Sequence, residues 1–209
     1  MNKFERAELD YVLDKAFAFH GKPCGGTVIG VRMAMLGLRM IGITDPKGAE
    51  RKDIIAVAEN DRCAVDALQH VTGCRVATRA LKLKDYGKMA ATFVNLKTGK
   101  AVRIVCPEET RDRVQKYKPE EGEKKERTIA GYKAMPLDEL FYAQEVTASF
   151  EDADMPGPAK HRIQCEQCGE SVSDHREREV NGKSLCIHCS EGGYYEVVSD
   201  RIAVPAGAA

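Results

Sequence analysis

The first 40 residues carry apolar side chains at helical spacing. Over residues 4–19 the apolar positions share one stripe and most charged residues lie off it, which predicts an amphipathic helix. Residues 26–40 are apolar nearly all round and hold small residues at short intervals. This second segment is therefore predicted to be a buried helix that its neighbours approach closely.

Shorter segments with strand and helix patterns follow. Strands are predicted at residues 53–58, 81–83, 89–96 and 101–105, and helices at 61–71, 107–117 and 136–144. The charge run at residues 118–127 is predicted to be a loop. Together they indicate an α+β core domain over residues 1–150, with a small, mainly antiparallel sheet covered by helices.

The end of the chain has a different composition. Residues 151–160 are rich in Asp, Pro and Gly, which is typical of a linker. We place a second, small domain at residues 160–200 and expect residues 203–209 to form a frayed tail.

Two Cys-x-x-Cys pairs occur in this second domain. They are Cys165-Glu-Gln-Cys168 and Cys186-Ile-His-Cys189, and four thiolates are a complete ligand set for tetrahedral Zn²⁺. Between them, Val180-Asn-Gly-Lys183 predicts a type I′ hairpin. The order of knuckle, hairpin and second pair resembles a treble-clef zinc finger, with a short or absent final helix.

Charge and composition restrict the partners. The chain has 32 Lys and Arg against 32 Asp and Glu, and six basic against eight acidic residues lie between Lys160 and Arg201. We therefore do not expect nucleic acid as a partner. No apolar run is long enough for a membrane span and the N-terminus lacks a secretory pattern, so we expect a cytoplasmic protein whose eight cysteines are ligands or free thiols.

Three of the remaining cysteines are candidates for a shared site. Cys24 and Cys63 each precede or begin a predicted helix, where the helix dipole favours a thiolate, and Cys74 follows the next helix end. Asp66 shares a helix face with Cys63. A free cysteine can equally be a small buried apolar side chain, and Cys106 is interpreted that way.

Two motifs resemble the FmdE family, which is named after one component of formylmethanofuran dehydrogenase. They are His20-Gly-Lys-Pro-Cys24-Gly-Gly26-Thr-Val-Ile-Gly30 and Asp61-Arg-Cys63-Ala-Val-Asp66, the latter followed by Thr72-Gly-Cys74 and Lys84-Asp-Tyr-Gly-Lys88. The resemblance covers about residues 10–105. It implies a dimeric α+β core with an auxiliary treble-clef finger, and a metal-capable pocket formed by His20, Cys24, Cys63 and Cys74.

The resemblance also implies association with a molybdenum or tungsten enzyme of methanogenesis, although many relatives occur outside that pathway. Two positions depart from the family pattern: Lys22 stands where a second His is expected, and Gly25 where Pro often follows the cysteine. A protonated lysine cannot bind a metal, so the core pocket lacks one expected ligand.

The leading hypothesis is a metal-binding accessory protein with a redox or C1-linked role. If a second transition metal binds in the core, His20, Cys24 and Cys63 are its ligands, with Asp66 and Cys74 in supporting or alternative positions. If none binds, Cys24 and Cys63 are the candidate catalytic thiols. The alternative is a non-enzymatic interaction protein whose finger contacts a partner protein or nucleic acid. Whether the protein is an enzyme stays open, and we expect a homodimer.

Overall fold

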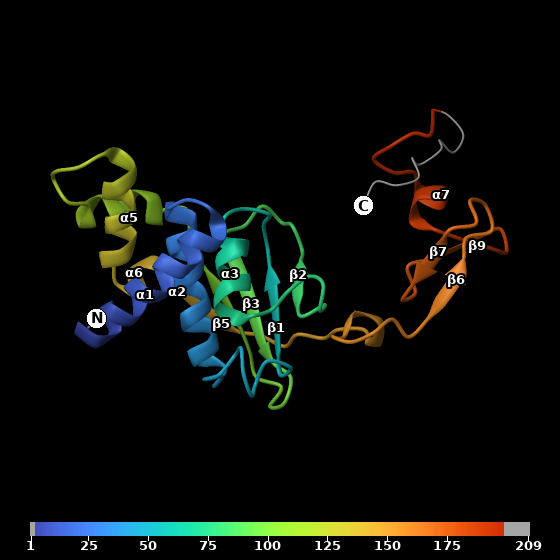
Figure 1. Cartoon of the computed structure of the whole chain (residues 1–209), viewed down its shortest axis with the longest axis horizontal. Coiled ribbons are helices and arrows are strands. Elements are labelled where there is room, and N and C mark those ends of the chain that lie inside the picture. The colour runs from blue at the N-terminus through green and yellow to red at the C-terminus, as the bar shows by residue number, and fades with distance from the viewer. Residues whose placement is uncertain (1–2, 199–209) are drawn as a thin grey trace, which may run out of the picture. The chain divides into compact units, whose positions relative to one another are not determined.

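The computed structural model describes residues 3–198 of the chain, with side chains from Arg6 onward. The chain forms two compact units (Figure 1). The first contains residues 3–150 and Met155–Gly157, and the second contains Glu151–Asp154 and the described chain from Pro158 onward. The predicted tail at residues 203–209 and the last two residues of the predicted finger, 199 and 200, lie outside the described residues.

A five-stranded sheet forms one layer of the first unit. Its strands are β1 (Ile54–Ala58), β2 (Leu81–Leu83), β3 (Ala90–Asn95), β4 (Ala101–Val105) and β5 (Tyr142–Glu145). Their order is β2-β1-β3-β4-β5, and only the β1–β2 pair is parallel. The prediction of an α+β core with a small, mainly antiparallel sheet is confirmed.

Helices cover one face of this sheet. They are α1 (Lys3–His20), α2 (Gly25–Met40) and α3 (Ala64–Thr72), followed by α4 (Thr110–Arg113), the 3-10 turn η1 (Val114–Tyr117), α5 (Lys124–Ala134) and α6 (Leu137–Leu140). Ile54, Ala56 and Phe93 point from the strands into a continuous apolar core with the helices. Within residues 3–198 no helix is long and apolar enough to span a membrane.

Helix α2 is the centre of this core. It contacts α1, α3, α5 and the strands β3 and β4, and Val28, Val31 and Ala34 are completely buried. The apolar surface of α2 is therefore buried by contacts within one chain. The expectation of a homodimer loses its argument from this helix and now depends on the family resemblance alone.

The predicted helix over residues 107–117 is shorter and ends as the 3-10 turn η1, and two other segments differ more from their predicted structure. Helix α5 occupies part of the predicted loop, although only Gly131 and Tyr132 of this helix are buried. The predicted helix over residues 136–144 divides into α6 and the strand β5, whose four residues are all exposed. Pairing with β4 produces β5, and neither segment has an apolar face that would have indicated its structure.

The second unit is small. It contains the 3-10 turn η2 (Asp152–Asp154), the hairpin of β6 (Arg162–Gln164) with β7 (Ser171–Ser173), the hairpin of β8 (Arg178–Val180) with β9 (Lys183–Leu185), and the short helix α7 (Ile187–Glu191). Asn181 and Gly182 both have positive φ, 53° and 77°, as a type I′ turn requires. The predicted hairpin and short final helix are confirmed.

Candidate metal centres

The four paired cysteines of the second unit converge. Their sulfur atoms all lie within 4.8 Å of one another, and the Sγ atoms of Cys168 and Cys186 are 4.0 Å apart. Zn–S bonds of about 2.3 Å place the sulfurs of a tetrahedral site about 3.8 Å apart. The cluster therefore has the size that one zinc ion requires.

Local backbone geometry prepares this cluster for a cation. Gly169 has φ 74° and donates its N–H to the carbonyl of Cys165, which closes the first knuckle. Hydrogen bonds from the backbone N–H groups of Cys168 and Cys186 lower the pKa of Cys165 to about 6. These amides stabilise a thiolate, the form that binds Zn²⁺.

A second cluster lies in the first unit, where three segments meet. His20 is the last residue of α1, Cys24 is the N-cap of α2, and Cys63 is the N-cap of α3. A ring nitrogen of His20 and the two sulfurs lie within 4.8 Å of one another. We call these three residues the core cluster.

Close packing of α2 on α3 brings the two cysteines together. A Cβ atom on Gly30 would lie 2.7 Å from both the carbonyl oxygen of Ala64 and the Cβ of Ala67, and one on Gly26 would lie 3.2 Å from the Cβ of Cys63. Only glycine allows the first of these approaches. The glycine spacing of α2 thus places the N-terminal ends of both helices at one point.

Hydrogen bonds orient the core cluster. His20 Nδ1 donates to Asp66 Oδ2 at 2.7 Å, so in the neutral ring Nε2 carries the lone pair. That Nε2 atom lies 3.7 Å from the Sγ of Cys24. The backbone N–H of Thr27 donates to the same sulfur at 3.4 Å, and the Thr27 hydroxyl lies 3.1 Å from it.

The two thiols of the core cluster titrate differently. Partial burial alone would raise the pKa of Cys24, but the hydrogen bonds from Thr27 and Cys63 and the charge of His20 lower it below its ordinary value. Burial and the neighbouring Cys24 raise the pKa of Cys63. The hydrogen bond to Asp66, opposed by burial, raises the pKa of His20. Cys24 therefore loses its proton first.

Cys74 does not belong to this cluster, and the prediction that it does is wrong. It follows Gly73, the C-cap of α3, whereas Cys63 caps the other end of that helix. The sulfur of Cys74 is buried 3.9 Å from the carbonyl oxygen of Ile54, and burial raises its pKa. Cys74 is a core residue, as Cys106 is.

The sequence missed the supporting role of Thr27, and it indicated a supporting role for Asp66 without its partner. Thr27 is fully buried, and its hydroxyl forms a hydrogen bond with the sulfur of Cys24. The signal in the sequence was a hydroxyl residue three positions after an N-cap cysteine. Asp66 was expected beside Cys63, but its hydrogen-bond partner is His20, 46 positions away. Residue spacing within one helix cannot reveal a contact with another helix.

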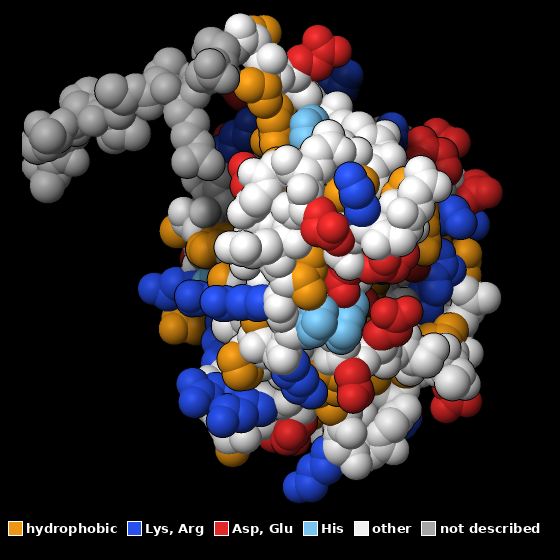
Figure 2. All heavy atoms as spheres, turned by 90° about the vertical axis from the view of Figure 1, so that its right-hand side faces the viewer, with side chains coloured by type: hydrophobic (Ala, Val, Ile, Leu, Met, Phe, Trp, Pro, Cys, Tyr) orange, Lys and Arg blue, Asp and Glu red, His pale blue; other side chains and the backbone are white. Residues whose placement is uncertain are grey.

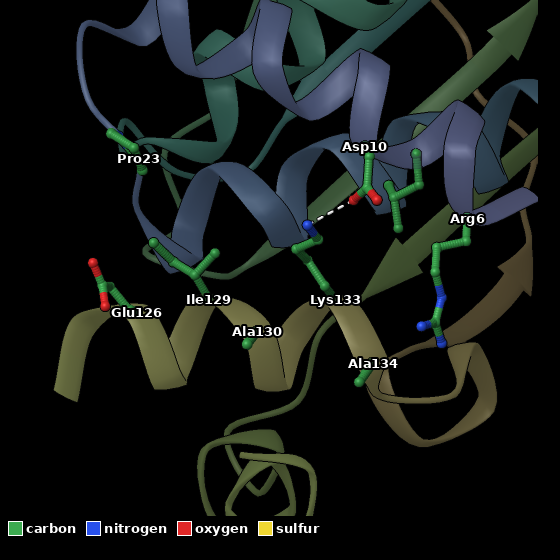
Figure 3. A pocket seen from close by; sticks show the side chains of 9 residues that line it. Arg6, Asp10, Pro23, Glu126, Ile129, Ala130, Lys133 and Ala134 are labelled. Atoms are coloured by element: carbon green, nitrogen blue, oxygen red, sulfur yellow. Dashed lines mark ion pairs between the residues drawn. The ribbon is translucent and has the colours of Figure 1, made fainter. Parts of the chain in front are cut away.

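The first unit also has a hollow of about 410 Å³ between α1 and α5. Figure 3 shows Asp10 and Lys133 pointing toward each other across it, in an ion pair of 2.6 Å. None of its lining residues is a cysteine or a histidine. The hollow therefore offers no soft metal ligands, and the core cluster is the better candidate site.

Comparison with known proteins identifies both units. The family described as "FmdE, Molybdenum formylmethanofuran dehydrogenase operon" matches residues 19–142, which contain the whole core cluster. The "Prokaryotic dksA/traR C4-type zinc finger" matches residues 157–194. Together with the geometry of the four cysteines, this match makes the second unit a C4 zinc finger that binds Zn²⁺.

Two further similarities extend over nearly the whole chain. A "Probable S-adenosyl-L-methionine-binding protein" of Archaeoglobus fulgidus is 28% identical over 92% of this chain, which spans only 56% of that relative's length. The crystal structure of a tungsten formylmethanofuran dehydrogenase FmdE-like protein from Syntrophus aciditrophicus has a TM-score of 0.59 at 21% identity, covering 90% of this chain and 95% of its own. Because the family match extends over more than half of the chain, this metal-binding protein belongs to the FmdE family.

Proposed function

We propose that the core cluster binds one transition metal through His20, Cys24 and Cys63, and that the protein is a metal-dependent accessory protein with a redox or C1-linked role. The observation that carries this proposal is the Asp66–His20 hydrogen bond of 2.7 Å. It leaves the lone pair of His20 Nε2 on the side of the two sulfurs. A carboxylate that orients a histidine in this way is the usual support of a metal ligand.

The donor set suits a borderline metal with an open coordination position. Two thiolates and one imidazole are the protein ligands of some catalytic zinc sites, where water or substrate takes the fourth position. Lys22 is exposed, and its positive charge partly opposes the rise that burial and Cys24 cause in the pKa of Cys63. Such a charge favours an anionic rather than a neutral ligand at the open position.

Each residue of the site has a distinct task in this proposal. His20 accepts the metal through Nε2, Asp66 holds the Nδ1 proton, and Thr27 keeps Cys24 in its thiolate form. A bound metal would act as a Lewis acid toward the ligand in the open position. The accessory role rests on the family's name, and the S-adenosylmethionine binding named for the Archaeoglobus relative is a property of that longer protein.

A second candidate function needs no metal. The lowered pKa of Cys24 and the proximity of Cys63 are also the features of a reactive thiol pair, so the two residues would act as the catalytic thiols. The third alternative, an interaction protein, would use the finger to contact a partner protein. That contact and the homodimer stay predictions.

Cobalt substitution separates these functions. The metal-free full chain is first loaded with one equivalent of Zn²⁺, which the four-thiolate finger takes up, and Co²⁺ is then added under reducing conditions. Metal binding at the core cluster predicts a thiolate-to-cobalt charge-transfer band that Cys63→Ala weakens and Cys106→Ala leaves unchanged. The absence of such a band, with fast alkylation of Cys24 retained, would favour the thiol pair instead.

A further inference from the structure

Three donor groups gather on the zinc-finger unit away from its four cysteines. They are His161, His175 and Glu177, and one ligand atom of each lies within 4.8 Å of the others. Figure 2 shows histidine side chains at the surface with acidic side chains beside them. None of the three residues has a part in the proposed function of the core cluster.

The backbone brings these residues together by hairpin pairing. Arg162 pairs with Ser173 at the open end of the β6–β7 hairpin, and the backbone N–H of Asp174 donates to the carbonyl of His161 at 2.9 Å. Asp174 and His175 both have positive φ, 58° and 56°, an uncommon conformation for residues other than glycine. This turn folds the ring of His175 onto that of His161, with centroids 4.1 Å apart and planes within 10°.

Glu177 lies where both rings can reach it. Its Oε1 atom is 3.1 Å from Nε2 of His161 and 3.4 Å from Nδ1 of His175. Its other oxygen, Oε2, is buried and lacks a hydrogen-bond partner among the described residues. A buried carboxylate oxygen without a partner is costly, and a cation bound to the carboxylate would offset that cost.

We propose that His161, His175 and Glu177 form a second metal site on the finger, for Zn²⁺ or a similar divalent transition metal. Zn–N bonds of about 2.0–2.1 Å and Zn–O bonds of about 2.0–2.2 Å place neighbouring ligands of one tetrahedral ion about 3.3–3.5 Å apart. The distance from Oε1 to Nδ1 of His175 falls in this range, and the distance to Nε2 of His161 is slightly shorter. Because the two rings are stacked, one imidazole must turn when the ion binds so that both nitrogens point at it. Imidazole ligands favour such metals over Mg²⁺ or Ca²⁺.

Unlike the four-cysteine site, this site would leave a coordination position without a protein ligand. Two histidines and one carboxylate leave at least one coordination position for water or an outside ligand. The side chain of His175 is 63% exposed and that of Glu177 16%, so the open position faces solvent. The finger would then carry one structural ion with four protein ligands and one ion with an open coordination position.

Zinc counting tests this proposal. The full chain with Cys24→Ser and Cys63→Ser, which removes the thiolates of the core cluster, is dialysed against a zinc buffer and its bound zinc is measured. We expect two ions per chain, and about tenfold or more weaker binding of the second ion in Glu177→Gln. Glu179→Gln, the same change two residues away on exposed β8, is the matched control and should retain both ions.

Each outcome decides the matter. One ion per chain in the starting protein, or two tightly bound ions in Glu177→Gln, would overturn the proposal and leave a hydrogen-bonded cluster only. If Glu177→Gln lost both ions through misfolding, His175→Ala, the most exposed of the three positions, would replace it under the same criteria. Ring proton resonances of His161 and His175 should also shift together as the second zinc equivalent binds; unshifted rings would contradict the site.

Discussion

The two thiol clusters of this protein stand on very different scaffolds. The four finger cysteines belong to a unit whose described hydrophobic cluster has only Cys165, Val172 and Leu185 as buried members. The core cluster rests on helices α1, α2 and α3, which share a large apolar core with the sheet. A metal at the four finger cysteines holds the second unit together. The core cluster, in contrast, is built by packing that needs no metal.

This difference suggests a structural role for the finger cysteines and a functional role for the core cluster. A unit with so few buried side chains gains little from the hydrophobic effect, and structural zinc contributes about 10–16 kcal/mol in finger peptides. In the first unit the fold itself brings His20, Cys24 and Cys63 together. Donors that a stable scaffold has already positioned are available for binding and exchange, which is why we propose the core cluster as the functional site.

The largest expected effect is loss of the finger without loss of the core. Cys168→Ser removes one of four zinc ligands, and we expect the second unit to unfold while the first keeps its structure. Among the described residues, the apolar core of the first unit contains no residue of the finger. Proteolysis combined with circular dichroism measures both. Equal zinc content in the mutant and the wild type would show that the four cysteines are not the zinc site.

The next effect concerns the packing that builds the core cluster. Gly30→Ala would place a Cβ atom 2.7 Å from the backbone oxygen of Ala64. Overpacking costs about 1–3 kcal/mol, which outweighs a gain in helix propensity of up to about 1 kcal/mol. We expect a lower free energy of unfolding in urea, with a smaller loss in Gly26→Ala, whose nearest contact is 3.2 Å. A stabilised Gly30→Ala would contradict this role of the helix crossing.

Thiol reactivity distinguishes the core cluster from buried cysteines. In metal-free protein near neutral pH, Cys24 should react with iodoacetamide faster than Cys63 or Cys106, because the pKa of Cys24 is lowered and those of the other two are raised. Its rate should therefore reach its plateau at lower pH. Peptide mass spectrometry measures the three rates. Thr27→Val, which removes the hydroxyl beside the sulfur, should slow only Cys24; an unchanged rate would exclude that contribution.

A smaller effect is expected at the departure from the family pattern. Lys22→His replaces a cation by a metal ligand, and we expect metal affinity at the core cluster to rise by about tenfold, or about 1.4 kcal/mol. Lys22→Gln removes the charge alone and separates electrostatics from ligation. Competition with a coloured chelator measures both variants. If the two variants bound equally well, the introduced imidazole would not act as a ligand.

How much of this fold the sequence could predict depends on local pattern. Helices α1 and α3 follow from periodicity because each has one apolar face. Helix α2 and the strands β1, β3 and β4 follow from apolar runs that are largely buried. Helix α5 buries only Gly131 and Tyr132, and β5 is exposed along its length. Contacts that are distant in sequence create both, so no local pattern marks them.

The same limit applies to the sites. Two Cys-x-x-Cys pairs are visible at once, and Cys24 and Cys63 could be linked because both begin helices. Cys74 was misplaced because its sequence context gives no direction for its side chain. His161 and Glu177 meet through a hairpin across 16 positions, and the Asp66–His20 contact spans 46; only the folded chain shows either.

The central claim is that the core cluster binds a metal of its own. Native mass spectrometry of the zinc-saturated full chain counts the bound ions in wild type, Cys24→Ser and Cys106→Ser. The account predicts one ion fewer in Cys24→Ser than in wild type and no change in Cys106→Ser, since Cys106 is a core residue. An equal number of bound ions in wild type and Cys24→Ser would contradict it.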